Sequence, residues 1–493
     1  MNKRTLVHPH APHSETYIPR VLPGVLGNFD MTMNFVAVVF LVVNSIRVSS
    51  AGPVSIFYWF LGLICFFLPA LLAVGQLGRM YPNEGSTYNW TYRGLGRFWS
   101  FFCTLLFWLP NPVGMVGVLS MAFYFLRGLN SGWFVEPWQQ GVSIIGVIVF
   151  VAVFSLQRLR VIQNVVNIVV LLNIFSVALV GLAALIWLLG GHQPATDLAS
   201  SRAWAISPQN MSMLGVVALA YLGLHVPAIS GAETTSKFSP TRYLFWGSLI
   251  VVLSYVMVNL AVLLIEGPRV AILGPFAIVD MADQVFGKTV GNIVAVINLA
   301  AYPVKCAITS SIFARLLMVA SVDRFLPLGL CKLNHNRAPV NAILFQTLLA
   351  LLFAAVIYFL PYITPLLNPQ TLSPVVASVC LAMLTLLWTL STLVIFINLL
   401  VAYIRDRQKF HQCRKVPMPL IWLSMFIGPF VCVLALVVVF AASEAENVLT
   451  DMRWQLLVGG LTVICLILAF TASLLVTSEA AWQDQARNEV SST

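Results

Sequence analysis

The feature that most constrains this chain is a series of twelve long apolar stretches, which together cover most of its 493 residues. Hydrophobic residues make up 59% of the chain and charged residues 9%, and the mean hydropathy is +0.91. A soluble protein of this size needs more polar residues than that to cover its surface. A helix of about 20 apolar residues crosses the hydrocarbon core of a bilayer, where backbone polar groups must pair internally. The sequence therefore predicts an all-α polytopic membrane protein with about twelve transmembrane helices.

The breaks between the apolar stretches divide the chain into two tails and one membrane domain. We expect a cytoplasmic tail at 1–29, a single transmembrane domain at 30–477 and a second cytoplasmic tail at 478–493. The first 29 residues have no apolar core, so a cleavable signal peptide is not expected. The predicted spans are 31–51, 54–78, 98–126, 141–156, 161–189, 211–232, 243–265, 289–318, 339–360, 372–404, 416–442 and 454–477.

The distribution of lysine and arginine predicts the orientation. With the amino terminus inside, 20 of the 27 Lys and Arg residues lie on the cytoplasmic side and five on the outer side, and two lie within spans. This asymmetry places both termini in the cytoplasm of a multi-pass protein of the cell membrane, either plasma or inner. The net charge of +10 would then face anionic lipid, so the bilayer rather than a nucleic acid is the expected partner.

Sequence motifs for several kinds of chemistry are missing. The chain has no GxxxxGK[ST] phosphate loop, no HExxH and no GxSxG, which argues against an ATP-driven pump and the corresponding hydrolases. Its eight cysteines show no metal-ligand spacing. We therefore expect neither an enzyme nor a bound cofactor or metal.

Three segments interrupt or close the spans in a way that is typical of transporters, which use broken helices to bind substrate near the bilayer midplane. The sixth span contains Tyr221-Leu222-Gly223-Leu224-His225-Val226-Pro227, where Pro227 removes a backbone donor. The second span runs into Tyr81-Pro82-Asn83-Glu84-Gly85 and an aromatic segment that predicts a helix at the inner interface. The eighth span closes with Arg315 and then Asp323-Arg324-Phe325-Leu326-Pro327. The alternative interpretation of the sixth span is a continuous helix in which the glycine only allows close packing and the proline only produces a kink.

Together these segments resemble the amino acid–polyamine–organocation permeases, and most closely the amino-acid exchangers for glutamate/γ-aminobutyrate and arginine/agmatine. Trp108-Leu109-Pro110-Asn111 in the third span adds to the resemblance. It implies two inverted five-helix repeats, at about 31–189 and 211–404, with two peripheral helices at about 416–477. The family glycines of the first span correspond here to Ala37-Val38-Val39, which leaves open whether this helix is unwound. The lysine of the fifth span, a stand-in for sodium in many members, is missing; that span offers Asn164, Asn167 and Asn173.

The resemblance places a substrate site between spans 1, 3, 6 and 8. Gly223 would leave the backbone approachable, Asn111 would provide one hydrogen bond, and His225 would supply a titratable contact where the exchangers usually have a glutamate. The alternative for His225 is a histidine that bonds a neighbouring carbonyl and never changes charge. The full predicted set is Val36, Ala37, Val38, Asn111, Tyr221, Leu222, Gly223, His225, Lys305 and Thr309.

Two charged residues near or within spans matter most for function, because a charge in the membrane costs about 2.5–3.5 kcal/mol on insertion scales. Lys305 lies near the middle of the eighth span, and Thr309 shares its helix face. The ammonium is either solvated by carbonyls (those near Pro303 being candidates) and water, deprotonated, or visited by an anionic ligand. Glu233 lies at the inner end of the sixth span and is expected to reach the interface.

The sequence therefore predicts a secondary-active transporter, permease or antiporter, that moves neutral or acidic amino acids or related metabolites by alternating access. Two alternatives stay open: a permease for amines or polyamines, and a transporter-like sensor or partner subunit without transport of its own. The scarcity of buried acids argues against the amine alternative, because a cationic substrate needs a negative partner. The oligomeric state is open, with a homodimer as one alternative.

Overall fold

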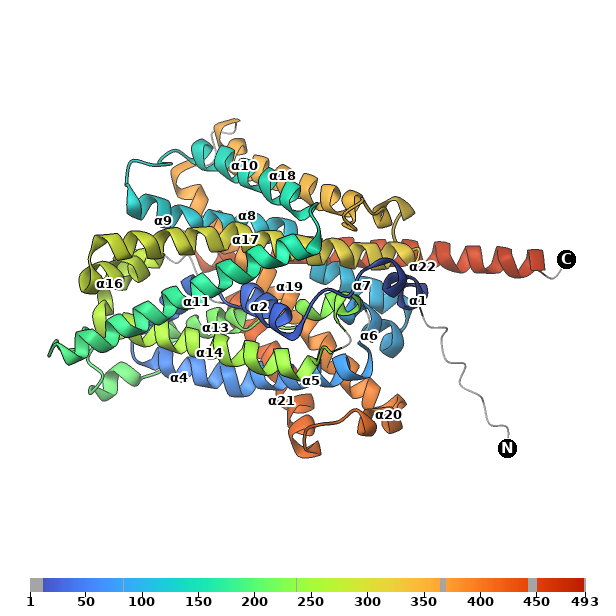
Figure 1. Cartoon of the computed structure of the whole chain (residues 1–493), viewed down its shortest axis with the longest axis horizontal. Helices are drawn as coiled ribbons and strands as arrows, with labels where there is room; N and C mark the ends of the chain where they lie inside the picture. Colours follow the sequence, from blue (N-terminus) through green and yellow to red (C-terminus); the bar gives the residue numbers. More distant parts are fainter. Residues whose placement is uncertain (1–11, 83, 236, 364–368, 442–449, 492–493) are drawn as a thin grey trace.

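A computed structural model describes residues 12–82, 84–235, 237–363, 369–441 and 450–491, which fold into a bundle of helices (Figure 1). The helices of the first six predicted spans are α2 (Asn28–Val39), α3 (Val42–Ser49), α4 (Val54–Gly62), the π-helix η1 (Leu63–Phe67), α5 (Leu68–Met80), α7 (Arg97–Trp108), α8 (Pro110–Ser120), α9 (Ala122–Leu129), α10 (Pro137–Ser155), α11 (Leu159–Leu189), α13 (Met213–Ala220) and the 3₁₀ segment η3 (Pro227–Glu233). The later spans are α14 (Pro240–Ile265), α17 (Lys288–Val322), α18 (Val340–Ile363), α19 (Pro369–Arg405), α21 (Met418–Ala441) and α22 (Asp451–Ser491).

Shorter helices connect these spans. They are α1 (His13–Val21), α6 (Ser86–Leu95), η2 (Ser201–Trp204), α12 (Pro208–Met211), η4 (Gly267–Arg269), α15 (Val270–Leu273), η5 (Gly274–Phe276), α16 (Ala277–Phe286), η6 (Leu328–Cys331) and α20 (Arg407–Gln412).

The number of spans agrees with the sequence. Among the described residues, ten helices are long and apolar enough to cross a membrane, and the pair α2–α3 makes an eleventh with a bend of 42°. The remaining span, predicted at 211–232, consists of α13 and η3 separated by the turn 221–226. The two broken spans are therefore the first and the sixth, five apart, as two five-helix repeats require. The prediction of an all-helical polytopic membrane protein with the fold of the amino acid–polyamine–organocation permeases is confirmed.

The core of the bundle is formed by the broken spans and the third span. Every residue of α8 is buried, as are ten of the twelve residues of α2. Large apolar side chains on the outer helices point outward instead, among them Phe150 of α10, Phe245 of α14 and Phe430 of α21. Apolar side chains on the outside suit a hydrocarbon environment, so composition and burial both indicate membrane embedding.

The predicted helix after the second span is present as α6. Its residues Ser86–Tyr92 are all buried, and it packs against α7, α19 and η3. Protein rather than lipid therefore covers this helix, which corrects the expectation that it lies at the membrane interface. An aromatic-rich segment suits either environment, and the sequence alone does not distinguish them.

The first described helix, α1, is tied to the ends of two others. The backbone N–H and the hydroxyl of Ser14 donate to the Asp323 carboxylate just after α17, at 2.8 and 2.7 Å. Glu15 pairs with Arg93 of α6 through two hydrogen bonds. Helix α1 and the carboxyl end of α22 lie at the same end of the bundle (Figure 1), which we refer to as the inner end.

Candidate functional site

The first broken span leaves the helical backbone conformation at Phe40 and Leu41. Both residues have extended backbone conformations, and α3 begins directly afterwards at Val42. The last carbonyls of α2 therefore lose the partners that a continuous helix would give them. The break needs no glycine, because extended backbone is open to any residue. The structure thus answers the question that the missing family glycines left open: the first helix is broken, one residue beyond Ala37-Val38-Val39.

Side chains from two other spans form hydrogen bonds with the carbonyls that this break exposes. The Lys305 ammonium of α17 donates to the Val38 carbonyl at 2.6 Å. The hydroxyl of Tyr255, in α14, lies 2.8 Å from the Val39 carbonyl and 3.2 Å from the Ala220 carbonyl at the end of α13, and accepts the Leu41 N–H at 3.1 Å. One tyrosine hydroxyl thus contacts both broken spans.

The turn in the sixth span packs directly against this break. Gly223 adopts φ +83°, and a Cβ added there would lie 3.1 Å from Val38 Cγ1 and 3.3 Å from Trp388 Cζ3. Only glycine takes this left-handed conformation without strain. Gly223 therefore allows the sixth span to touch the first. That it leaves the backbone approachable for a substrate stays a prediction.

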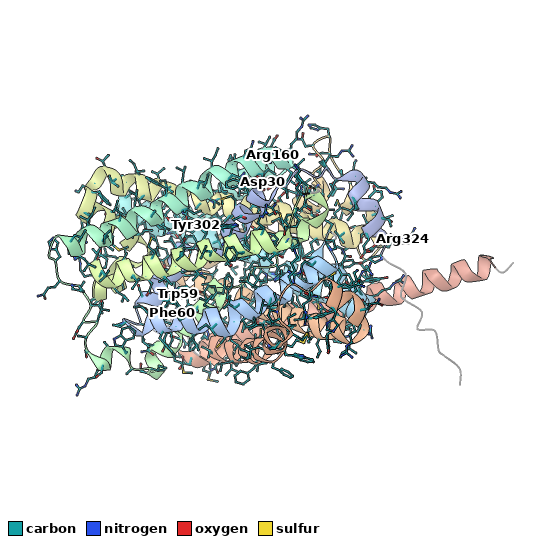
Figure 2. The ribbon with its side chains drawn as sticks, turned by 60° about the horizontal axis from the view of Figure 1, so that its bottom comes forward. Asp30, Trp59, Phe60, Arg160, Tyr302 and Arg324 are labelled. Atoms are coloured by element: carbon teal, nitrogen blue, oxygen red, sulfur yellow. The ribbon has the colours of Figure 1, made fainter. Side chains whose placement is uncertain are left out.

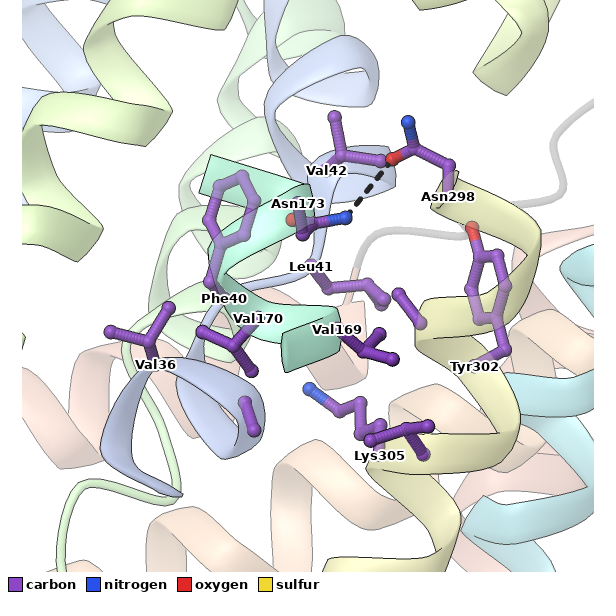
Figure 3. A pocket seen from close by; sticks show the side chains of 13 residues that line it. Val36, Phe40, Leu41, Val42, Val169, Val170, Asn173, Asn298, Tyr302 and Lys305 are labelled. Carbon is purple, nitrogen blue, oxygen red and sulfur yellow. Dashed lines mark hydrogen bonds between the residues drawn. The ribbon is translucent and has the colours of Figure 1, made fainter. Parts of the chain in front are cut away.

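Lys305 lies between two cavities and lines both. The first is formed by residues of α2, α11 and α17, including Val36, Ala37, Asn173 and Tyr302 (Figure 3). Its polar wall includes Asn173, whose Nδ2 donates to Asn298 Oδ1 at 3.4 Å. The fifth span therefore contributes an amide to this cavity, and the ammonium comes from the eighth span. The carbonyl that holds it belongs to α2, not to the neighbourhood of Pro303.

The second cavity also borders the α2–α3 break and combines a mostly apolar wall with several polar groups. Lys305 contributes its ammonium. Asn111 Nδ2 and Asn44 Oδ1 are buried and have no hydrogen-bond partner among the described residues. Such groups are costly to bury unless something else pairs with them. The cavity is otherwise lined by Val38, Val39, Leu41, Gly114, Met115, Val118, Leu219, Leu222, Cys306, Thr309, Leu381, Leu384 and Trp388.

Seven of the ten predicted site residues line these cavities. Tyr221, Gly223 and His225 line neither. The Tyr221 ring stacks on Phe67 at 4.5 Å between centroids and meets Trp59 edge-on at 5.5 Å. Their role in substrate contact stays a prediction for another conformation of the transport cycle.

His225 is fully buried in this conformation. Its ring lies 4.3 Å from the Phe107 ring, centroid to centroid, and neither ring nitrogen has a partner among the described residues. The proposed alternative, a bond to a neighbouring carbonyl, therefore does not occur within the described structure. Nothing in this arrangement stabilises a charged imidazole.

Sequence reasoning missed Asn44, Tyr302 and Trp388 as cavity residues. Asn44 offered a signal, since it is a polar residue inside an apolar span one turn from the break. Tyr302, whose buried hydroxyl has no partner among the described residues, precedes Pro303 and could have been found in the same way. Trp388 carried no signal, because a tryptophan in an apolar span is ordinary packing.

Two acids at span ends are paired rather than available to substrate. Asp30, at the start of α2, pairs with Arg160 of α11 at 2.9 Å (Figure 2) and accepts from Asn167 at 2.8 Å. Glu233 is buried and bonded twice to the Arg315 guanidinium. The expectation that Glu233 reaches the interface is wrong, because the partner arginine 82 residues away could not be recognised from sequence.

Comparison with known proteins agrees with this architecture. Residues 24–465 match the amino acid permease family, and the chain belongs to that family. Membership of this family identifies the chain as a membrane transporter. The apolar composition of its spans and its helical fold agree with this assignment.

Two relatives are similar over part of the chain. A probable agmatine/putrescine antiporter of Lactococcus lactis is 23% identical over 128 residues, which are 26% of this chain and 27% of that protein. An uncharacterized transporter of Legionella pneumophila is 21% identical over 258 residues, 49% of this chain and 53% of that protein. The chain thus matches about a quarter of the first relative and about half of the second.

Proposed function

We propose that this protein is a secondary-active transporter that moves neutral amino acids, or closely related neutral or acidic metabolites, by alternating access. The observation that carries the proposal is the polar set of the second cavity. Lys305 would attract a substrate carboxylate, Asn111 Nδ2 would donate to it, and Asn44 Oδ1 would accept from a substrate ammonium. The remaining wall is apolar apart from the Thr309 hydroxyl, which is bonded within its own helix, and suits an uncharged side chain.

The amino end of α3 supports the same orientation of substrate. It has no side-chain cap. Its N-cap residue, Leu41, borders both cavities, and its first residue, Val42, borders the first. Helix amino termini attract negative charge through their unpaired N–H groups and the helix dipole. A carboxylate between Lys305 and this helix end would have favourable partners on both sides. A second carboxylate would find no further cation among the described lining residues, so neutral amino acids fit better than acidic ones.

An amine antiporter is the second candidate, and the printed function of the Lactococcus relative favours it. Against it, no Asp or Glu occurs among the residues lining the two cavities, and Lys305 lines both. An ammonium in a low-dielectric cavity repels a cationic substrate more strongly than it would in water. A sensor or partner subunit is a third candidate and predicts binding without transport.

The remaining features of the proposal concern the membrane. We infer that the protein lies in the cell membrane with both termini in the cytoplasm, supported by the 20-to-5 distribution of Lys and Arg. The two five-helix repeats at about 31–189 and 211–404, the peripheral helices at about 416–477 and an assembly as a homodimer belong to the same proposal.

The test is a binding and transport comparison of Lys305→Met with Lys288→Met, an exposed lysine at the start of the same helix. A ligand that binds the folded protein raises its thermal stability, so a panel of amino acids, amines and polyamines can be screened first. We expect neutral amino acids to stabilise and to be taken up into liposomes that contain the wild type. Lys305→Met should weaken binding by more than about tenfold, or about 1.4 kcal/mol, while Lys288→Met stays within a few-fold.

Other outcomes separate the candidates. Saturable uptake of putrescine or agmatine by the wild type would contradict the electrostatic reasoning and favour the amine antiporter. Ligand-induced stabilisation without uptake or exchange in liposomes would favour a sensor or partner subunit.

A further inference from the structure

A cluster of three charged side chains lies buried near the inner end, away from the two cavities. Glu84 follows the second span, Glu233 ends η3 and Arg315 belongs to α17, and each is at most 2% exposed. The Arg315 guanidinium is fully engaged. Its Nε and Nη2 donate to the two Glu233 carboxylate oxygens, the latter at 3.0 Å. Its Nη1 donates to the carbonyl and the hydroxyl of Ser311, at 2.9 and 2.7 Å.

Glu84 has no cation of its own. Its Oε2 accepts the Ala232 N–H at 2.8 Å, and its buried Oε1 has no hydrogen-bond partner among the described residues. The cluster therefore contains two carboxylates and one guanidinium, and the guanidinium is already bonded to Glu233. Burial, and then repulsion from Glu233, hold the pKa of Glu84 well above its usual range, although Arg315 and the Ala232 N–H act in the opposite direction.

No other described cation compensates for the second carboxylate. The helices packed around the cluster are α6, α17, η3 and α2, with α1 behind them. Asp30, the acid of α2, is paired with Arg160. Asp323, after α17, accepts from Ser14 of α1, and Arg93 of α6 is paired with Glu15. Tyr88, the remaining titratable group on the facing side of α6, is buried and neutral in its ordinary state. The charged and titratable groups considered on these elements are therefore Glu15, Asp30, Tyr88, Arg93, Glu233, Arg315 and Asp323.

The same cluster joins the segments that lead into the first and sixth spans. The Glu233 carbonyl accepts the N–H groups of Val25 and Leu26, at 2.8 and 2.9 Å, just before α2. The Gly85 N–H, next to Glu84, donates to the Ile229 carbonyl of η3 at 2.7 Å. Separation of these segments at the inner end would break these bonds and admit water to both carboxylates.

We propose that Glu84 is a proton-binding site that couples closure of the inner end to protonation. In the closed arrangement Glu84 carries a proton on Oε1 and the cluster is neutral. When the inner end opens, the Oε1–H bond breaks, the electron pair stays on the carboxylate and the proton leaves to water. This inference rests on the proposed transport function only for its role in the cycle, since proton binding can be measured without any substrate.

The direct test is infrared difference spectroscopy of the purified full-length protein as a function of pH, because a protonated carboxyl absorbs separately from a carboxylate. The variant is Glu84→Gln, whose side-chain oxygen can still accept the Ala232 N–H. The control is Glu15→Gln, which removes a carboxylate that has an arginine of its own. We expect a protonated-carboxyl band of equal intensity at about pH 7 in the wild type and in Glu15→Gln, and a weaker band in Glu84→Gln, where Glu266, whose pKa is also raised to about 7, still contributes. An unchanged band in Glu84→Gln, or no such band in the wild type, would overturn the assignment.

A second measurement links the proton to opening. Hydrogen–deuterium exchange of peptides covering 81–90 and 227–235, corrected for the intrinsic pH dependence, reports how often the inner end opens. Linkage of one proton predicts that the opening equilibrium rises by up to tenfold per pH unit in the wild type. In Glu84→Gln the corrected exchange should be independent of pH. A pH dependence that persists in Glu84→Gln would refute the coupling. Absence of transport in liposomes would refute the proposed function and leave both of these results standing.

Discussion

The Tyr255 hydroxyl offers the sharpest test of how the broken helices are held. Tyr255→Phe removes only this oxygen. The aromatic ring, which is stacked on Trp59 at 4.4 Å and lies 5.0 Å from Phe40, keeps its packing. The Leu41 N–H then loses its partner, and the hydroxyl proton is no longer available to the Val39 or Ala220 carbonyl. The substitution thus isolates the hydrogen bonds from the stacking.

The magnitude follows from these bonds. A buried donor left without a partner costs about 1–3 kcal/mol, while a hydrogen bond between membrane helices is worth on average about 0.6 and at most about 1.7 kcal/mol. The hydroxyl accepts one bond and can donate only one proton at a time, so two bonds are lost together. Leu41 borders both cavities, and water that reaches its N–H would reduce the loss. We expect a decrease of about 1–3 kcal/mol in the free energy of unfolding.

The assay is reversible unfolding by titration with a denaturing detergent, with Tyr243→Phe as the control. Tyr243 lies in the same helix, is equally buried and packs on Phe238, but its hydroxyl has no hydrogen-bond partner among the described residues. Tyr243→Phe should therefore change stability by less than about 0.5 kcal/mol. Equal free energies of unfolding for the two variants would refute the reasoning that the Tyr255 hydroxyl holds both breaks.

Two further predictions concern pH. His225→Gln should leave the pH profile of transport unchanged, because the imidazole is buried against Phe107 without a described partner that would stabilise its charge; a flattened profile, measured by liposome uptake, would show that another conformation exposes this ring. Burial, and then repulsion from Asp280, raise the pKa of Glu266 to about 7. The folded protein therefore binds more protons than the unfolded chain between the usual carboxyl pKa of about 4.3 and about 7, and its stability falls as pH rises through that window. Glu266→Gln should remove this fall in thermal melts recorded across the window, and a fall of the same size in the variant would contradict the assignment.

Span number and type were predictable because length and hydropathy are local properties of a sequence. About twenty apolar residues in a row form a helix in lipid, and this rule gave the ten spans that are single long helices among the described residues. The break in the sixth span was also visible, because Gly223 and Pro227 each change the backbone in a known way. The break in the first span was not. Phe40 and Leu41 have no special backbone preference, and the groups that stabilise the break, Tyr255 and Lys305, lie more than 200 residues away in the chain.

For the charged residues, too, some features could be predicted from the sequence and others could not. That Lys305 lies inside the membrane domain could be predicted from its place in an apolar span. Its partner could not, because every residue has a backbone carbonyl and the sequence does not show which one lies nearby. Glu233 was assigned to the interface for the opposite reason. Residues at span ends usually reach water, and only the folded structure brings Arg315 beside it.

Lys305 and Tyr255 engage adjacent carbonyls of the same helix end, but they differ in what can displace them. The Tyr255 hydroxyl is neutral and bonded on both sides of the break, so a substrate gains little by competing for it. The Lys305 ammonium holds a single carbonyl oxygen, that of Val38, and a carboxylate is a stronger partner for an ammonium than a carbonyl is. Under the proposed function, a substrate carboxylate in the second cavity would draw the ammonium away from Val38 and leave the end of α2 held by Tyr255 alone. Substrate binding would then loosen the first span at its break, the point about which its two halves must turn during alternating access.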